Sequence, residues 1–270
     1  MLAWAQSGHP NAGKRATWWL KKLWNDSELE SDSKLLPSVR TYNAVLKALA
    51  AAEGAMAAES LLLDLGDKFR EERLAYLRPN SESFSIVIRA WLQQAHSDDD
   101  IHEKTKSLSR AVEWLSSLRE VEDETRLSTA PELYTGVMRA ALSCARARPD
   151  VLELATRAFN DLRNSRYEVD CFSYSLMVQV ALAALSGPDD GDVRDSFLQR
   201  VFEDCCEDGL ISNAFIKAIA QSRVHASGWT VEERERLMKS FFGNWPLPAS
   251  WTRNVSNETF LPIAFVESMK

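Results

Sequence analysis

The chain has 270 residues, 45% of them hydrophobic and 26% charged, a composition that excludes a globally disordered protein. Its formal net charge of −7 argues mildly against non-specific nucleic-acid binding, although the distribution of charges matters more than their sum. The sequence has no run of about 18 apolar residues, so we expect no membrane-spanning helix and no membrane partner.

The N-terminal region admits two interpretations. Its first 25 residues contain no acid and four cations, which are Lys14, Arg15, Lys21 and Lys22. Such a segment is typical of an organelle transit peptide. However, the spacing of Ala16, Trp19 and Leu20 is that of Ala111, Trp114 and Leu115 further along the chain. We therefore expect residues 1–38 to be a partial N-terminal repeat in a fragment that begins partway through a unit, with a targeting segment as the alternative.

One pattern recurs in five stretches: an aromatic residue, a small polar residue and then aliphatic residues at helical spacing, with Ser212 replacing the aromatic residue in the last stretch. The polar residues are Asn43, Ser85, Thr135, Ser175 and Asn213, which are 42, 50, 40 and 38 residues apart. In the first stretch, Tyr42, Val45, Leu46 and Leu49 follow the i, i+3, i+4, i+7 rule of a one-sided helix. Self-similarity at such a period indicates stacked supersecondary units.

A second helix is expected in each unit, marked by a small residue and a bulky residue four positions later, as in Ala58 and Leu62 or Ala155 and Phe159. The sequence therefore predicts an all-α fold, a superhelical solenoid of antiparallel helix-pair repeats. Five repeats are expected over residues 39–249, followed by a capping segment at 250–270. The expected repeats span about 39–80, 81–130, 131–170, 171–208 and 209–249.

The segment from Val39 to Leu46, preceded by Pro37, resembles the first helix of a pentatricopeptide repeat. Arg78 to Asn80 and Glu168 to Asp170 resemble the repeat ends of that family. The resemblance covers about residues 1–254. It implies a non-catalytic protein that binds single-stranded RNA sequence-selectively, one base per repeat. It also implies a role in organellar RNA metabolism and processing in mitochondria or plastids, with the cytoplasm as the alternative location.

The resemblance also implies roles for single residues, because the fifth and the last residue of a repeat contact the base edge together in that family. By matched position the pairs are Asn43 with Asn80, Ser85 with Ala130, Thr135 with Asp170, Ser175 with Asp208, and Asn213 with Ala249. The two pairs that end in alanine are expected to be silent or non-selective. Phe172 and Leu210 occupy the position that stacks on the base, whereas Arg40, Glu82 and Glu132 occupy it in other repeats.

A charge pattern gives an independent indication of a binding surface. The residues four positions beyond the expected base readers are Lys47, Arg89, Arg139, Gln179 and Lys217. Residues four apart share a helix face, so the four cations would line one groove and bind phosphates. Ordinary solvated positions are the alternative explanation. The same stripe would also suit an acidic peptide, so a scaffold that binds a peptide or partner helix is the second functional hypothesis.

Residue patterns that carry chemistry are absent from the sequence. The four histidines show no metal-ligand pairing, and no phosphate-binding loop or nucleophile motif occurs. We therefore expect no catalytic site, metal, cofactor or small-molecule substrate. An enzyme whose catalytic domain lies elsewhere has no residues in its support. The tryptophans expected in the core, with base stacking as the alternative, are Trp18, Trp19, Trp24, Trp91 and Trp114.

Overall fold

The computed structural model describes residues 3–4, 7–30, 36–71, 74–125, 131–165, 167, 169–212, 215–216, 219 and 249–255. These residues form helices and connectors without a β-strand, which confirms the expected all-α class. The chain divides into two compact units, Met1–Ala140 and Ala141–Lys270. No helix among the described residues is both long enough and apolar enough to cross a membrane.

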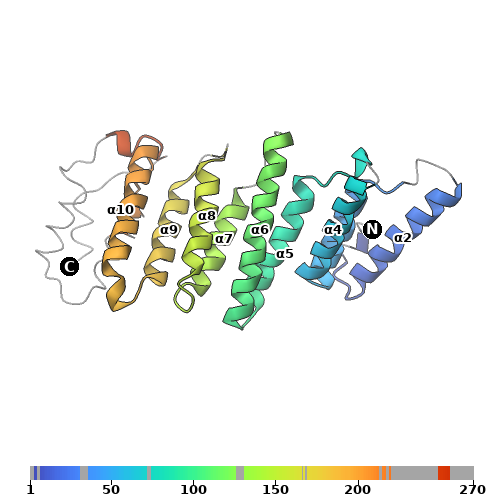
Figure 1. Ribbon diagram of the computed structural model, residues 1–270, viewed down its shortest axis with the longest axis horizontal. Helices are drawn as coiled ribbons and strands as arrows, with labels where there is room; N and C mark the ends of the chain where they lie inside the picture. The colour runs from blue at the N-terminus through green and yellow to red at the C-terminus, as the bar shows by residue number, and fades with distance from the viewer. Residues whose placement is uncertain are drawn as a thin grey trace, which may run out of the picture. The chain divides into compact units, whose positions relative to one another are not determined.

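Antiparallel neighbours along the chain build the first unit (Figure 1). Its helices are α2 (Ala12–Glu30), α3 (Val39–Ala52), α4 (Ala55–Glu71), α5 (Ser81–Ser97) and α6 (Ile101–Thr125), with a 3-10 turn η2 at Ala75–Leu77. Each of these helices packs on the next one, and α3 also packs on α5. Within this unit α3 and α5 therefore lie side by side, with α4 packed on both.

Helix α7 (Glu132–Cys144) runs across the boundary between the two units. The second unit contains α8 (Val151–Arg163), α9 (Cys171–Ala184) and α10 (Gly191–Asp208), with 3-10 turns η3 at Pro188–Asp190 and η4 at Ala249–Trp251. Within it, α9 packs on both α8 and α10, and η4 packs on α10. The α10 helix is terminated by the capping residue Gly209, whose φ of 71° is in the left-handed region that glycine adopts without steric cost.

Side-chain caps fix where three of the first helices begin. Ser38 caps α3, Asn80 caps α5 and Asp170 caps α9. The Asn80 and Asp170 side-chain oxygens accept hydrogen bonds from the backbone N–H of the third helical residue at 3.1 Å and 2.8 Å. Such a cap contributes about 1 kcal/mol to stability. The residues that end the expected repeats are therefore the residues that start the next helices.

The core follows the two periodic patterns of the sequence. The aromatic positions of the first helices, Tyr42, Phe84, Tyr134 and Tyr174, are at most 8% exposed. The small residues of the second helices are fully buried, which is so for Ala58, Ala111 and Ala155. Small residues allow close helix approach, and the bulky residue four positions later fills the remaining space. The expected packing faces are thus confirmed.

The tryptophans divide into two groups. Trp91 is buried, Trp24 donates its indole N–H to the Tyr42 hydroxyl at 3.1 Å, and Trp114 packs on an aromatic neighbour. In contrast, Trp18 and Trp19 are 51% and 41% exposed, so their expected place in the core is wrong. The α2 helix buries Ala16 and Leu20 instead, and the two indoles lie on the opposite, solvent-facing side.

Candidate functional site

Among the described residues, the expected base readers at the fifth repeat position and the expected phosphate contacts lie on α3, α5, α7 and α9, and we call their positions on these helices the first-helix face. Among the expected readers at the last repeat position, Asn80 and Asp170 cap α5 and α9, and Asp208 ends α10. In the first unit this face includes Asn43 and Lys47 on α3, Ser85 and Arg89 on α5, and Thr135 and Arg139 on α7. In the second unit it includes Ser175 and Gln179 on α9. Asn213 and Lys217 lie outside the described residues, as does Ala130.

The structure brings the first expected pair of base readers together. Asn43 Nδ2 donates to Asn80 Oδ1 at 3.2 Å and to Glu82 Oε2 at 3.0 Å. Asn43 Oδ1 accepts the Ser83 hydroxyl at 2.7 Å. Asn43 is 2% exposed, so both of its N–H donors are used inside the protein. This pair therefore joins α3 to the start of α5 and has little capacity left for a ligand.

The Lys47 ammonium is neutralised in the same cluster. Its Nζ lies 2.6 Å from Glu82 Oε1, with the two side chains 47% and 50% exposed. The hydrogen bond from Lys47 lowers the pKa of the Glu82 carboxyl, the bond from Asn43 adds to this effect, and burial opposes it. Glu82, which occupies an expected stacking position, thus holds the place that a phosphate would need next to Lys47.

Arg89 and Arg139 differ from Lys47 because they carry no acidic partner among the described residues. Both side chains are exposed, on α5 and α7 of the first unit. The readers one turn before them donate to their own helices: Ser85 Oγ to Ser81 O at 2.7 Å and Thr135 Oγ1 to Glu132 O at 3.3 Å. Each hydroxyl oxygen keeps acceptor capacity, so these two positions can accept a hydrogen bond beside an available cation.

In the second unit the first turn of α9 combines a cap with an exposed aromatic ring. Asp170 Oδ1 accepts from the Ser173 N–H and hydroxyl at 2.8 Å and 2.6 Å. Ser175 is 7% exposed and donates to Cys171 O at 2.9 Å. Phe172 is 52% exposed, as a residue that stacks on a base must be.

The carboxylate of Asp208 is held inside the second unit. It accepts a forked pair of hydrogen bonds from Arg163, Nε to Oδ2 at 3.1 Å and Nη2 to Oδ1 at 3.2 Å, and a further bond from the Tyr174 hydroxyl. Arg163 Nη1 also lies 2.8 Å from Asp204 Oδ1. Burial and the bond to Asp208 raise the pKa of the Tyr174 phenol. Burial alone would lower the pKa of the Arg163 guanidinium. The hydrogen bonds to Asp208 and the negative charges of Asp208 and Asp204 outweigh this effect and raise the pKa.

Two other expected residues lie near Asp208. Leu210, expected to stack on a base, is 6% exposed and packs in the second unit. Ala249 is exposed at the start of η4. A hollow of about 440 Å³ includes Arg163, Asp208, Leu210 and Arg253 in its lining. Arg163 already pairs with three acids, and Arg253 donates to Glu207 O at 2.6 Å. The two cations that line this hollow therefore already have partners within the protein.

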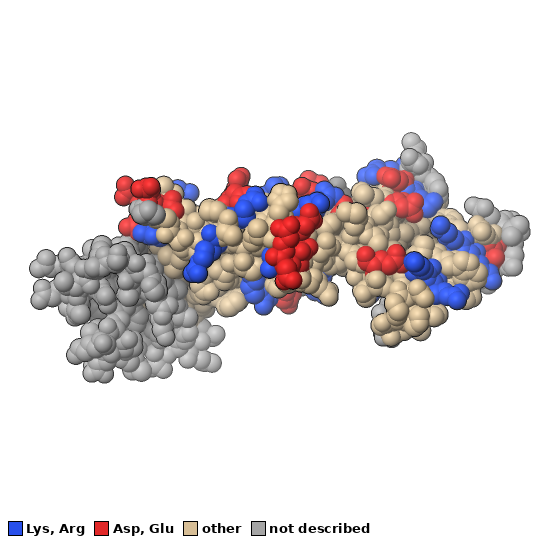
Figure 2. All heavy atoms as spheres, turned by 90° about the horizontal axis from the view of Figure 1, so that it is seen from below, with Lys and Arg blue, Asp and Glu red and all other residues tan. Residues whose placement is uncertain are grey.

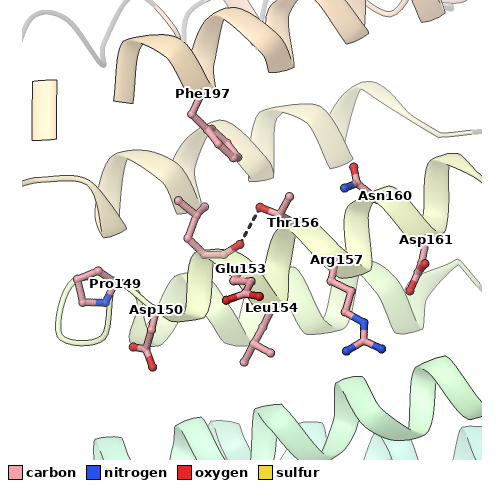
Figure 3. Close-up of a pocket in the computed structure, with 10 residues that line it drawn as sticks. Pro149, Asp150, Glu153, Leu154, Thr156, Arg157, Asn160, Asp161 and Phe197 are labelled. Atoms are coloured by element: carbon pink, nitrogen blue, oxygen red, sulfur yellow. Dashed lines mark hydrogen bonds between the residues drawn. The ribbon is translucent and has the colours of Figure 1, made fainter. Parts of the chain in front are cut away.

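A second hollow lies along α8 and is named here the α8 hollow (Figure 3). Its volume is about 670 Å³. The lining residues are Pro149, Asp150, Leu152, Glu153, Leu154, Thr156, Arg157, Asn160, Asp161 and Phe197. Phe197 points from α10 toward α8, whereas the charged groups come from α8 and the residues just before it. Asp150 is already paired with Arg148, whose Nη2 lies 2.6 Å from Asp150 Oδ2, so the acids of this hollow are partly neutralised within the protein, while Glu153 is exposed.

Charges of both signs are interspersed on the face of the molecule shown in Figure 2. No group of three histidine, cysteine, aspartate or glutamate side chains that could hold a metal occurs among the described residues. None of the four cysteines, all of which lie among the described residues, forms a disulfide.

A buried polar contact between helices was missed by the sequence analysis. Glu59 of α4 is 7% exposed and accepts the Trp91 indole N–H at 2.7 Å together with the Arg110 guanidinium. The sequence does carry a signal of this contact. Glu59 occupies a position on the helix face that is otherwise formed by the apolar residues Ala55, Ala58 and Leu62. Asn80 followed by Ser83 likewise indicates a helix cap, which the sequence analysis assigned only to base reading.

No protein-family model, no curated protein and no solved structure was found to match this chain.

Proposed function

We propose that this chain is a degenerate pentatricopeptide-type repeat protein that binds single-stranded RNA along its first-helix face, in organellar RNA metabolism. Support for the repeat comes from the shared plan of α3, α5, α7 and α9, each with a buried aromatic residue followed by a small polar one. Stacked as a superhelical solenoid, such helices would present equivalent residues to successive nucleotides.

The observation that carries the RNA proposal is that Arg89 and Arg139 are exposed and unneutralised among the described residues. Each is an exposed cation one turn beyond a hydroxyl-bearing residue, and neither has an acidic partner among the described residues. A cation without an intramolecular acid can neutralise a phosphate without first breaking an ion pair. In a chain of net charge −7, two such positions at equivalent places on two helices favour a phosphate-binding role.

Base selectivity is expected to be weak at the first repeat. Asn43 donates both of its N–H groups inside the protein, so reading a base there would require breaking buried hydrogen bonds. Each broken buried hydrogen bond costs about 1–3 kcal/mol. Phe172, beside Asp170 at the start of α9, is the better-placed base contact because its ring is half exposed. We therefore propose backbone binding with limited sequence preference.

The test is a salt series of RNA binding for the wild-type chain and R89Q/R139Q, measured by fluorescence anisotropy of a labelled single-stranded RNA. Each phosphate contact on a single strand contributes about −0.7 to the slope of log K against log salt concentration. Loss of two contacts should make the slope shallower by about 1.4. The matched control is R70Q/R200Q, which removes two exposed arginines that lie on α4 and α10 and not on the helices of the first-helix face. Equal slopes for the two double variants would refute the assignment of Arg89 and Arg139.

A protein-binding scaffold is the second candidate function, and the α8 hollow favours it. The exposed carboxylate of Glu153 and the half-buried Phe197 suit a basic amphipathic helix. Under this alternative a basic amphipathic peptide, but no RNA, binds the chain, and Glu153→Lys weakens the peptide complex. Retained peptide binding in Glu153→Lys would remove the α8 hollow from consideration.

A further inference from the structure

The solvent-facing side of α2 carries an uninterrupted set of basic and aromatic side chains. Its exposed residues in chain order are Asn11, Lys14, Arg15, Trp18, Trp19, Lys21, Lys22 and Asn25, with Asn11 just before the helix. Apart from Lys21, these positions recur at spacings of three and four, as one helix face requires. We call Lys14, Arg15, Trp18, Trp19, Lys21 and Lys22 the α2 patch.

The two tryptophans at the centre of the patch are held in a defined arrangement. Their ring centres are 4.9 Å apart, and the rings are inclined at 81°. Lys22 Nζ lies 5.6 Å from the centre of the Trp18 ring and 5.4 Å from that of Trp19, so it contacts both rings through cation–π interactions. With 51% and 41% of their surfaces exposed, the two indoles are available to a planar ligand.

The charge of the patch is of one sign. Residues 12–25 contain four cations and no acid. None of the four has an acidic partner among the described residues, in contrast to Lys47 or Arg163. Figure 2 shows basic side chains at the right of the view, with acidic side chains beside them, over the part of the chain where α2 lies in Figure 1. A partner of this surface must therefore be anionic.

Aromatic rings between cations select one kind of anionic partner. Single-stranded nucleic acid carries a flat base with every phosphate and so offers both kinds of contact at each step, whereas an acidic peptide has no ring tied to each of its charges. The patch from Lys14 to Lys22 is about 12 Å long at 1.5 Å per residue, the length of about three stacked nucleotides at 3.4 Å each. Insertion into a membrane would need a broad apolar face, but the apolar side of α2, with Ala16 and Leu20, is buried and α2 packs on α3.

We propose that the α2 patch is a second binding surface for single-stranded RNA, on which Trp18 and Trp19 stack with bases while the four cations hold phosphates. The proposal rests on the RNA binding proposed for the first-helix face and adds a site on a different helix. It differs in chemistry from that face, because stacking on exposed indoles tolerates every base and provides affinity without sequence selection.

The experiment compares W18A/W19A with the wild-type chain in binding labelled oligouridine, with inorganic polyphosphate as the probe that lacks bases. Loss of stacking on even one base should weaken oligouridine binding at least about fivefold. Polyphosphate affinity should stay unchanged, because the cations remain. The matched control is M56A/L63A, which removes two exposed apolar side chains of α4 that are 66% and 47% exposed. Circular dichroism verifies that each variant remains helical.

A second variant, K14Q/R15Q, keeps both indoles and should weaken binding of both probes. The proposal is overturned if W18A/W19A binds oligouridine as tightly as the control variant does. It is also overturned if W18A/W19A loses self-association, or binding to phosphatidylserine vesicles, while oligouridine affinity is unchanged. If R89Q/R139Q weakens oligouridine binding and W18A/W19A does not, the function proposed above stands and only the α2 patch fails. Absence of oligouridine binding by the wild-type chain refutes both proposals.

Discussion

Replacing Glu82 by glutamine is expected to strengthen RNA binding, because the Glu82 carboxylate neutralises Lys47. The Lys47 ammonium and this carboxylate are 2.6 Å apart, and both side chains are about half exposed. In Glu82→Gln the ammonium becomes available to a phosphate of the RNA. One additional phosphate contact on a single strand steepens the salt slope by about 0.7. At about 0.15 M salt this change corresponds to roughly fourfold tighter binding.

The cost of this substitution to stability is expected to be small. An exposed ion pair contributes about 0–1 kcal/mol, and the glutamine carbonyl can still accept the hydrogen bond from Asn43. The pKa of Glu82 is lowered from its ordinary value of 4.5, so its stabilising effect is fully present above that pH. The effect is lost as the pH falls through the lower pKa of the folded state. The stability difference between wild type and Glu82→Gln should therefore shrink below about pH 4.5 and disappear once the pH is below the lowered pKa of the folded state.

Anisotropy titrations of wild type, E82Q, K47Q and the double variant K47Q/E82Q test this reasoning. The double variant should lose the gain in affinity, because the cation released by E82Q is absent. Glu103→Gln is the matched control, since Glu103 pairs with Lys106 at 3.3 Å on α6, away from the first-helix face. If E82Q and E103Q bind RNA with equal affinity and equal salt slopes, or if K47Q/E82Q keeps the gain, the reasoning is refuted.

Three further outcomes follow from buried groups. Glu59→Ala should lower the free energy of unfolding in urea by about 1–3 kcal/mol, because the Trp91 N–H loses its acceptor. Glu59→Gln keeps an acceptor oxygen and should lose less, so equal losses in the two variants would contradict this contact. Tyr174→Phe removes a hydrogen bond to Asp208 and should cost about 0.5–1.5 kcal/mol in the same assay, so an unchanged midpoint would contradict the contact. Burial raises the pKa of the Cys206 thiol to about 12, so thiol reagents should label it slowly at neutral pH, and rapid labelling would be inconsistent with this burial.

Periodicity in the sequence was sufficient to predict the helices and their buried sides. A buried aromatic residue such as Tyr42 is recognisable because the residues three, four and seven positions later are also apolar. The small residues of the second helices are recognisable for the same reason. These signals are local, and helix packing in the structure follows them directly.

The partners of the polar residues could not be predicted in this way. Asn43 and Glu82 are 39 residues apart, and nothing local indicates that they form a hydrogen bond. The sequence places Asn43 on an expected ligand-binding face, whereas the tertiary contact buries it. The same applies to Asp208, whose partner Arg163 is 45 residues away. A periodic pattern thus locates a polar residue on a helix, but tertiary packing decides whether its hydrogen bonds remain available to a ligand.

The exposed indoles of α2 show the opposite case. Trp18 and Trp19 are adjacent, so both cannot occupy the centre of one buried stripe, and Ala16 with Leu20 fills the side of α2 that is buried. Residue type favoured the core for both tryptophans, but helical geometry excluded it. Relative to Ala16 and Leu20, Trp18 lies on the opposite side of the helix and Trp19 lies at the flank of the buried stripe, so helical phase places both indoles outside it.

The most direct test of the account is titration of a labelled single-stranded RNA with the purified chain between about 50 and about 200 mM salt. We expect binding that is micromolar or tighter at the low-salt end and weakens steeply as salt increases, and R89Q/R139Q should reduce that dependence. A folded, helical chain that does not bind RNA at about 50 mM salt, where electrostatic attraction is strongest, would contradict the central claim.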